Sequence, residues 1–183
     1  MSTVAPPRPG TSPKAAAATV ASVLIVAVCL TWTYLTMRSV MNVGGACADG
    51  GPYVSAQPCP DGSWLIAIAI PLLIIFSMLG TVTASSVGAP NLLVPMWGVL
   101  FGTLGWNFLE YAFKGPDLVW SWLVCGIVFW LMALPAFVLM LSQLRDQAAK
   151  PGQGRAVLWL PAYGVLGAAG VLVGWWSFVA IST

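Results

Sequence analysis

GGACADGGPYVSAQPCPDGS occupies residues Gly44 to Ser63 and separates two long apolar runs of the chain. Within this stretch, Cys47 and Cys59 enclose eleven residues that include two glycines and two prolines. Such a composition forms turns and cannot continue a helix. We therefore expect an exposed loop over residues 41–63, which divides the first membrane helix from the second.

The spacing of the two cysteines is not that of a CxxC redox pair, and the chain has no histidine that could complete a zinc site with them. A structural disulfide between Cys47 and Cys59 is the expected state, and two free thiols are the alternative. Closing a loop of this size contributes about 3 kcal/mol on the chain-entropy account. Cys29 and Cys125 lie in apolar runs and are expected to be buried.

The composition sets the class of protein. Hydrophobic residues make up 59% of the chain and charged residues 7%, a balance that soluble domains do not show. An all-α integral membrane protein is therefore predicted, in contact with membrane lipids. The formal net charge is only +2, and no basic cluster alternates with aromatic residues, so a nucleic-acid partner is not expected.

Five apolar runs are long enough to cross a bilayer whose hydrocarbon core is about 30 Å thick. Residues 1–18 precede them and are rich in Pro, Ser, Thr and Ala, so we expect a disordered cytoplasmic tail there and a five-helix transmembrane domain over residues 19–183. The expected spans are Thr19–Val40, Trp64–Ala84, Leu92–Phe113, Leu118–Leu141 and Ala156–Ile181.

The basic residues predict the orientation of the spans. Five of the seven Lys and Arg residues lie in the tail or between the fourth and fifth runs, and the other two, Arg38 and Lys114, lie on the opposite side. Cytoplasmic loops carry the excess of basic residues, so the amino terminus is expected inside and the carboxyl terminus outside. Loop 41–63 is then extracytoplasmic on a bacterial cell membrane, where a disulfide persists.

A polar site is expected in the third run, where Asn107 and Glu110 fall on one helical face. Ionisable residues inside spans are functional candidates, and these two side chains suit a cation, a proton or a polar ligand. The favoured alternative is an ion pair of Glu110 with Lys114, four residues later, at the headgroup boundary. A pairing of Arg38 with Glu110 across the bundle is a third arrangement.

Glycines mark the helix faces that we expect to pack closely. Gly98 with Gly102, and Gly170 with Gly174, are GxxxG pairs in the third and fifth runs. Helices in lipid associate where small residues let their backbones approach, so these faces should pack within the chain or on a partner.

The loop also carries a resemblance. Its pattern of cysteines, glycines and prolines resembles a loop in uncharacterised small multi-pass membrane proteins of actinobacteria. The resemblance covers about a tenth of the chain and implies a closed outer loop, without an activity. The residues that carry it are Cys47, Gly50, Gly51, Pro52, Tyr53, Pro58, Cys59 and Pro60.

These observations favour a protein that is not an enzyme. The chain has five carboxylates, no histidine, no P-loop and no dinucleotide fingerprint, so no catalytic residue, cofactor or metal site is predicted. An accessory or interaction subunit of a larger membrane assembly, bound to other membrane proteins or to itself, is the expected function. The alternative is a small homo-oligomeric transporter or channel for an ion or polar solute, with Asn107 and Glu110 lining the path.

Overall fold

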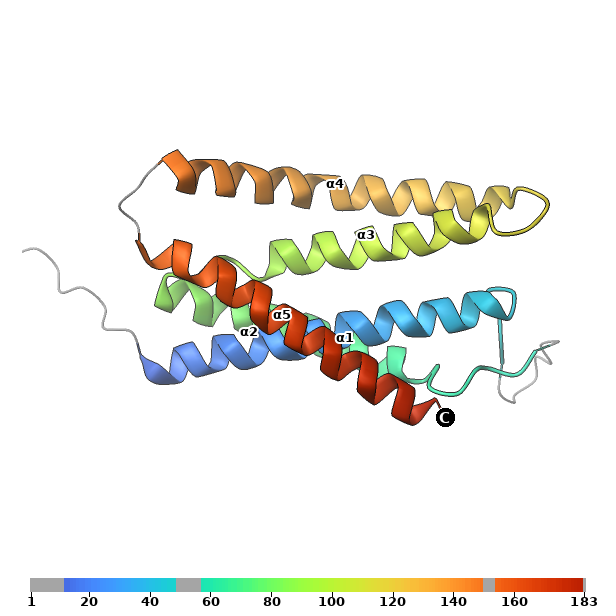
Figure 1. The fold of residues 1–183 in the computed structure, drawn as a ribbon, viewed down its shortest axis with the longest axis horizontal. Helices are drawn as coiled ribbons and strands as arrows, with labels where there is room; N and C mark the ends of the chain where they lie inside the picture. Colours follow the sequence, from blue (N-terminus) through green and yellow to red (C-terminus); the bar gives the residue numbers. More distant parts are fainter. Residues whose placement is uncertain (1–11, 49–56, 150–153, 183) are drawn as a thin grey trace, which may run out of the picture.

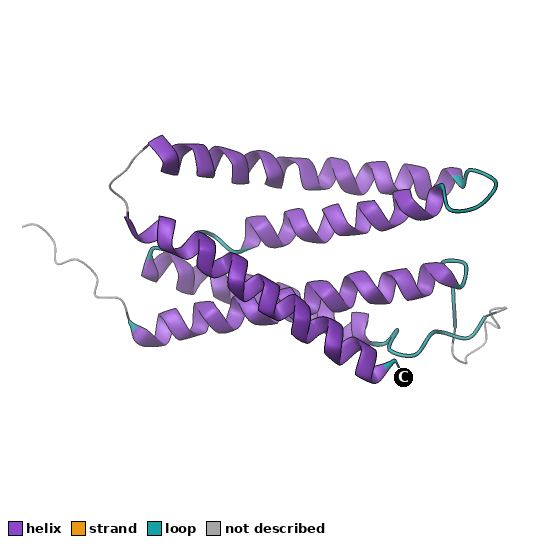
Figure 2. Ribbon diagram, viewed as in Figure 1, coloured by secondary structure: helices purple, strands orange, loops and turns teal. Residues whose placement is uncertain are grey.

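A computed structural model describes residues 12–48, 57–149 and 154–182 of the chain. These residues form helices and loops without any strand, as Figure 2 shows. The all-α prediction is thus confirmed. The five helices are α1 (Pro13–Asn42), α2 (Leu65–Val87), α3 (Leu93–Ala112), α4 (Trp120–Ala149) and α5 (Gly154–Ile181).

Consecutive helices run in opposite directions (Figure 1). The first residues of α1, the last of α4 and the first of α5 lie at one end of the molecule, which we call the α4–α5 end. The α3–α4 turn and the carboxyl terminus lie at the other, which we call the disulfide end. Five consecutive membrane passes require this alternation.

Four of the helices are long and apolar enough to cross a membrane: α1, α2, residues Trp120–Gln143 of α4 and Trp159–Ile181 of α5. Helix α3 is not among them, because Asn107 and Glu110 make it less apolar. Its 20 residues nevertheless extend for about 30 Å at 1.5 Å per residue, the thickness of the hydrocarbon core. A fifth pass by α3 stays a prediction that its length and direction favour.

Helix α1 begins earlier than the sequence predicted. It starts at Pro13, so residues 13–18, which we expected in the disordered tail, are helical. Proline is well tolerated at the first helical position, and the four alanines that follow Lys14 have the highest helix propensity. The remaining part of the predicted tail, residues 1–11, lies outside the described residues.

Helix α4 ends later than predicted, at Ala149 rather than near Leu141. The eight additional residues contain no glycine or proline, and Gln, Leu, Arg and Ala are good helix formers. Pro151 and Gly152 follow. The polar connection expected between the fourth and fifth spans is therefore mostly an extension of α4.

Helix α1 is the centre of the fold. Both α2 and α5 pack along it, whereas α3 and α4 pack on each other as an antiparallel hairpin. A smaller contact between α1 and α3 joins the hairpin to the other three helices. The buried apolar cluster draws on α1, α2 and the start of α3, and consists of Val23, Val26, Cys29, Ala69, Leu73, Leu92 and Met96.

The glycine pair of α5, which we expected to pack within the chain or on a partner, packs within the chain, against α1. A Cβ atom added to Gly170 would lie 2.5 Å from the Cβ of Ala27 and 2.9 Å from the carbonyl oxygen of Leu24. One added to Gly174 would lie 3.0 Å from the carbonyl oxygen of Val28. Only glycine permits this approach of the two backbones.

The glycines of α3 pack against α4. Added Cβ atoms at Gly98 and Gly102 would each lie 3.3 Å from a side-chain atom of α4, so the predicted pair is in close contact within the chain. The two backbones approach each other at Gly105, where an added Cβ would lie 3.1 Å from the carbonyl oxygen of Gly126, and at Gly126, where it would lie 3.0 Å from the backbone nitrogen of Leu109. Gly105 and Gly126 thus mark the crossing point of the hairpin.

A disulfide joins Cys47 to Cys59 with their Cα atoms 4.8 Å apart, which confirms the predicted pairing. The residues between them are described only at 48, 57 and 58. Cys29 is buried as expected, but Cys125 is exposed. The prediction for Cys125 was wrong because α4 packs chiefly on α3 and leaves much of its surface uncovered.

Candidate functional site

An ion pair links α1 to α3 near the disulfide end. Arg38 Nη1 donates to Glu110 Oε2 at 2.6 Å, and Nη2 donates to Oε1 at 2.7 Å. This is the two-pronged geometry in which a guanidinium binds a carboxylate most strongly. It is also the one salt bridge in the part of the chain that the structure describes.

The favoured expectation, an ion pair of Glu110 with Lys114, was wrong. Helix α3 ends at Ala112, so Lys114 lies beyond the helix and the spacing of four residues no longer brings its ammonium to the carboxylate. Lys114 Nζ instead donates to Asn42 Oδ1 at 3.1 Å. The carboxylate of Glu110 turns to α1, where Arg38 supplies two donors.

Asn107 is completely buried beside this pair. Its Oδ1 accepts from Arg38 Nη1 at 3.3 Å, and its Nδ2 donates to the backbone oxygen of Tyr34 at 3.3 Å. Both ends of the amide are therefore bonded to α1. The two polar residues predicted on one face of the third span do meet, and both serve the contact with α1.

Two tyrosines and an asparagine complete the group. The hydroxyl of Tyr34 accepts from Arg38 Nη1 at 3.2 Å, and that of Tyr111 lies within hydrogen-bond distance of Asn42 Oδ1 and of the Arg38 carbonyl oxygen. We call these residues the α1–α3 polar cluster. Its members are Tyr34, Arg38, Asn42, Asn107, Glu110, Tyr111 and Lys114.

Tyr34, Asn42 and Tyr111 were not predicted from the sequence as members of this cluster. A signal for two of them was present, because Tyr34, Arg38 and Asn42 recur every four residues and so share one face of α1. Tyr111 directly follows Glu110 and gave no such signal.

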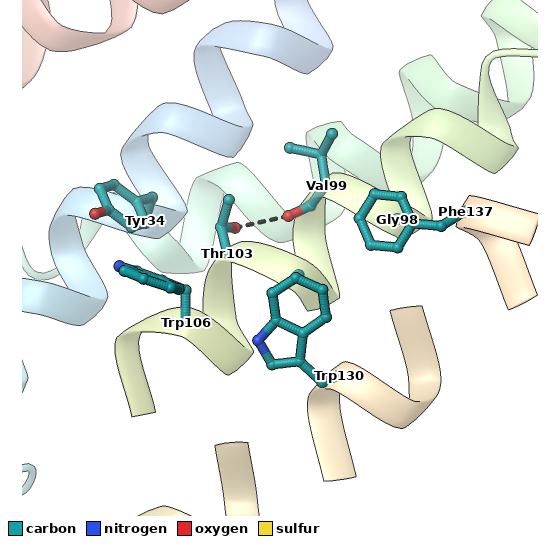
Figure 3. Close-up of a pocket in the computed structure, with 8 residues that line it drawn as sticks. Tyr34, Gly98, Val99, Thr103, Trp106, Trp130 and Phe137 are labelled. Carbon is teal, nitrogen blue, oxygen red and sulfur yellow. Dashed lines mark hydrogen bonds between the residues drawn. The ribbon is translucent and has the colours of Figure 1, made fainter. Parts of the chain in front are cut away.

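A second feature is a groove on the surface of α3. Three cavities of about 370, 320 and 390 Å³ all include Val99 in their lining and together form what we call the central groove. Tyr34 lines two of them, and Figure 3 shows it facing Trp106 and Thr103 in the first. The hydroxyl of Thr103 donates to the Val99 carbonyl oxygen at 2.7 Å, so the wall formed by these residues is apolar.

Other helices border the groove on two sides. Trp130 and Phe137 of α4 line its first cavity (Figure 3), while Gly167 and Gly164 of α5 line the second and third. The third cavity reaches the α4–α5 end. Tyr163 fixes that end, because its hydroxyl donates to the backbone oxygen of Pro90 at 2.9 Å and ties α5 to the α2–α3 turn.

Comparison with known proteins does not identify a relative of this chain. No protein-family model matches the chain, and no curated protein or solved structure gives a significant match. The resemblance of the loop to actinobacterial membrane proteins stays an expectation.

Proposed function

We propose that this integral membrane protein is a non-catalytic interaction subunit of a larger membrane assembly, and that α4 binds a transmembrane helix of another protein. The observation that carries the proposal is a stripe of uncovered apolar side chains along α4. They recur at alternating intervals of three and four residues, and each is about half exposed or more. The stripe consists of Val124, Ile127, Leu131, Leu134, Val138 and Leu141.

This spacing is that of the a and d positions of a coiled coil, with which one helix inserts side chains between those of another. Left-handed crossings of that kind are common among transmembrane helices. Within the chain, α4 packs on α3 through a different face, at Gly126 and Trp130. The stripe is therefore free to receive a partner helix.

The α1–α3 polar cluster supports the same proposal. Its carboxylate is held by two donors of Arg38 and its buried amide is bonded at both ends. These side chains stabilise the contact between α1 and α3 and leave little capacity for a reacting substrate. A role in assembly needs these side chains only to stabilise the fold.

Photo-crosslinking in the native membrane tests the proposal. A photoreactive amino acid at Leu134, on the stripe, should crosslink to one defined protein. The same amino acid at Leu139 is the matched control, because Leu139 is 50% exposed on another face of α4. Crosslinks to lipid alone from both positions would contradict the proposal, and so would crosslinks only to a second copy of this chain.

The location of the chain is part of the proposal. A cell membrane with the amino terminus inside is supported by the excess of basic residues in the sequence before α1 and between the fourth and fifth spans, and by the disulfide at the disulfide end. The Cys47–Cys59 loop then lies on the extracytoplasmic side and is a further surface for docking.

The transporter with Asn107 and Glu110 in its path has less support, because Arg38 already neutralises the carboxylate and Asn107 is inaccessible. Reconstituting the Glu110→Gln variant in vesicles separates the two functions. A loss of solute flux with unchanged recovery of the partner complex would favour the transporter.

A further inference from the structure

We propose that the central groove binds one acyl chain of an anionic phospholipid, whose phosphate group lies at the α4–α5 end of the molecule. This inference concerns a different surface from the stripe on α4, so it does not depend on the proposed interaction partner.

The length of the groove matches one leaflet. On α3 its lining runs from Pro95, near the start of the helix, to Trp106. Eleven residues at a rise of 1.5 Å correspond to about 16 Å, roughly half of a 30 Å hydrocarbon core. A chain that enters beside Pro95 therefore ends near the midplane of the bilayer or just beyond it.

The lining of the groove suits an acyl chain, because most of the residues that line the three cavities are apolar.

Two glycines of α5 keep the groove open. Gly164 and Gly167 line it, and a Cβ atom added to either would meet no atom within 4 Å. They differ in this from Gly170 and Gly174, which are pressed against α1. Close packing within the chain therefore does not explain them, whereas an acyl chain lying along α5 does.

The entrance of the groove suits an anionic headgroup. Asn91 and Gln143 are polar residues in the lining of the third cavity. Gln143 lies two residues before Arg145, which is exposed. Arg145 also lies two residues beyond the apolar segment Trp120–Gln143, so we expect it to lie near the lipid phosphates. Arg145 thus brings a basic side chain to this entrance, and basic sites between helices attract anionic lipids.

Lipid binding to the purified full-length protein tests this inference. The wild type in mild detergent, titrated with phosphatidylglycerol and observed by native mass spectrometry, should bind one lipid in preference to phosphatidylcholine. Gly164→Leu combined with Gly167→Leu fills open space, so this variant should fold normally and bind at least about tenfold more weakly, a change of about 1.4 kcal/mol. Arg145→Gln should weaken binding about fivefold, the equivalent of about 1 kcal/mol.

Val165→Leu is the matched control, since Val165 lies between the two glycines in α5, is 70% exposed and faces away from the groove, so this variant should bind lipid as the wild type does. Thermal unfolding of each variant verifies that it is folded. Equal lipid binding by the wild type and the double leucine variant would overturn the inference. Equal binding of phosphatidylcholine and phosphatidylglycerol would overturn the assignment of the headgroup.

Discussion

Arg38 and Glu110 neutralise each other's charge. This matters because an unpaired charge in or near the hydrocarbon of a membrane is costly in free energy. The guanidinium supplies two donors to the carboxylate and a further contact to the amide of Asn107. Breaking the pair leaves the surviving charge without its counter-ion. The ion pair and the Asn107 amide therefore help to hold α1 against α3.

Replacing Glu110 by Gln should lower the stability of the protein. The amide cannot accept two charge-assisted hydrogen bonds, and Arg38 loses its counter-ion. The side chains of the pair are 28% and 35% exposed, so we expect a loss of about 1 to 2 kcal/mol, toward the lower end of the range for charged hydrogen bonds. Thermal unfolding in detergent measures the loss.

Asp117→Asn is the control for this prediction, because Asp117 is an exposed carboxylate in the α3–α4 turn at the same end of the molecule. The Asp117→Asn variant should unfold at the same temperature as the wild type. An equal loss of stability in both variants would show that the pair has no special role.

Prediction from the sequence was weakest for the partners of individual polar side chains. Asn107 and Glu110 were found because polar residues stand out in an apolar run. Their partner was ranked wrongly, since Arg38 and Glu110 are 72 residues apart and local spacing favoured Lys114. Rules for neighbours on one helix cannot rank a contact that depends on how two helices pack.

At the scale of elements, glycine decides which helices approach each other. On α5, the residues Gly170 and Gly174 bring the backbone against α1, whereas Gly164 and Gly167 face open space. The spacing of the four glycines in the sequence is nearly regular, so the motif alone did not separate packing glycines from open ones. Gly105 and Gly126 lie in no shared motif, and only the folded hairpin brings them together.

Replacing Gly170 by Val should weaken the packing of α5 on α1. The new side chain would collide with the backbone oxygen of Leu24, which cannot move without shifting α1. Overpacking of this kind costs about 1 to 3 kcal/mol. Thermal unfolding in detergent should show the loss, together with faster amide hydrogen exchange in α5.

Gly164→Val is the matched control on the same helix, since a Cβ atom added there meets no atom within 4 Å. It should keep the wild-type exchange rates in α5. If Gly170→Val behaved in the same way, the close crossing of α1 and α5 would be refuted.

At the scale of the whole molecule, the apolar runs predicted five helices and their alternating directions, and the structure confirms this arrangement. The contacts among the helices were beyond such a prediction, because almost every face of a membrane helix is apolar. The division into a three-helix group around α1 and an α3–α4 hairpin follows from glycine crossings and from the α1–α3 polar cluster.

The disulfide gives a prediction about the molecule in its membrane. In intact cells, Cys47 and Cys59 should react with a membrane-impermeant thiol reagent only after reduction, if their loop is extracytoplasmic and closed. Cys47→Ser should lower the stability of the protein by about 3 kcal/mol, because it removes the constraint that closes the loop. Cys125→Ser should be neutral, because Cys125 is exposed. Full labelling of Cys47 and Cys59 without reductant would contradict the closed loop.

In the function that we propose, the stripe on α4 binds a transmembrane helix of another protein. The most direct measurement is the stoichiometry of the complex purified in mild detergent from the native membrane. The wild type should retain one other protein in a fixed ratio, and the double variant Leu131→Ala with Leu134→Ala should lose it. The control pair Met132→Ala with Leu139→Ala, on another face of α4, should keep it. A wild type purified without any other protein, or equal retention by both double variants, would contradict the claim.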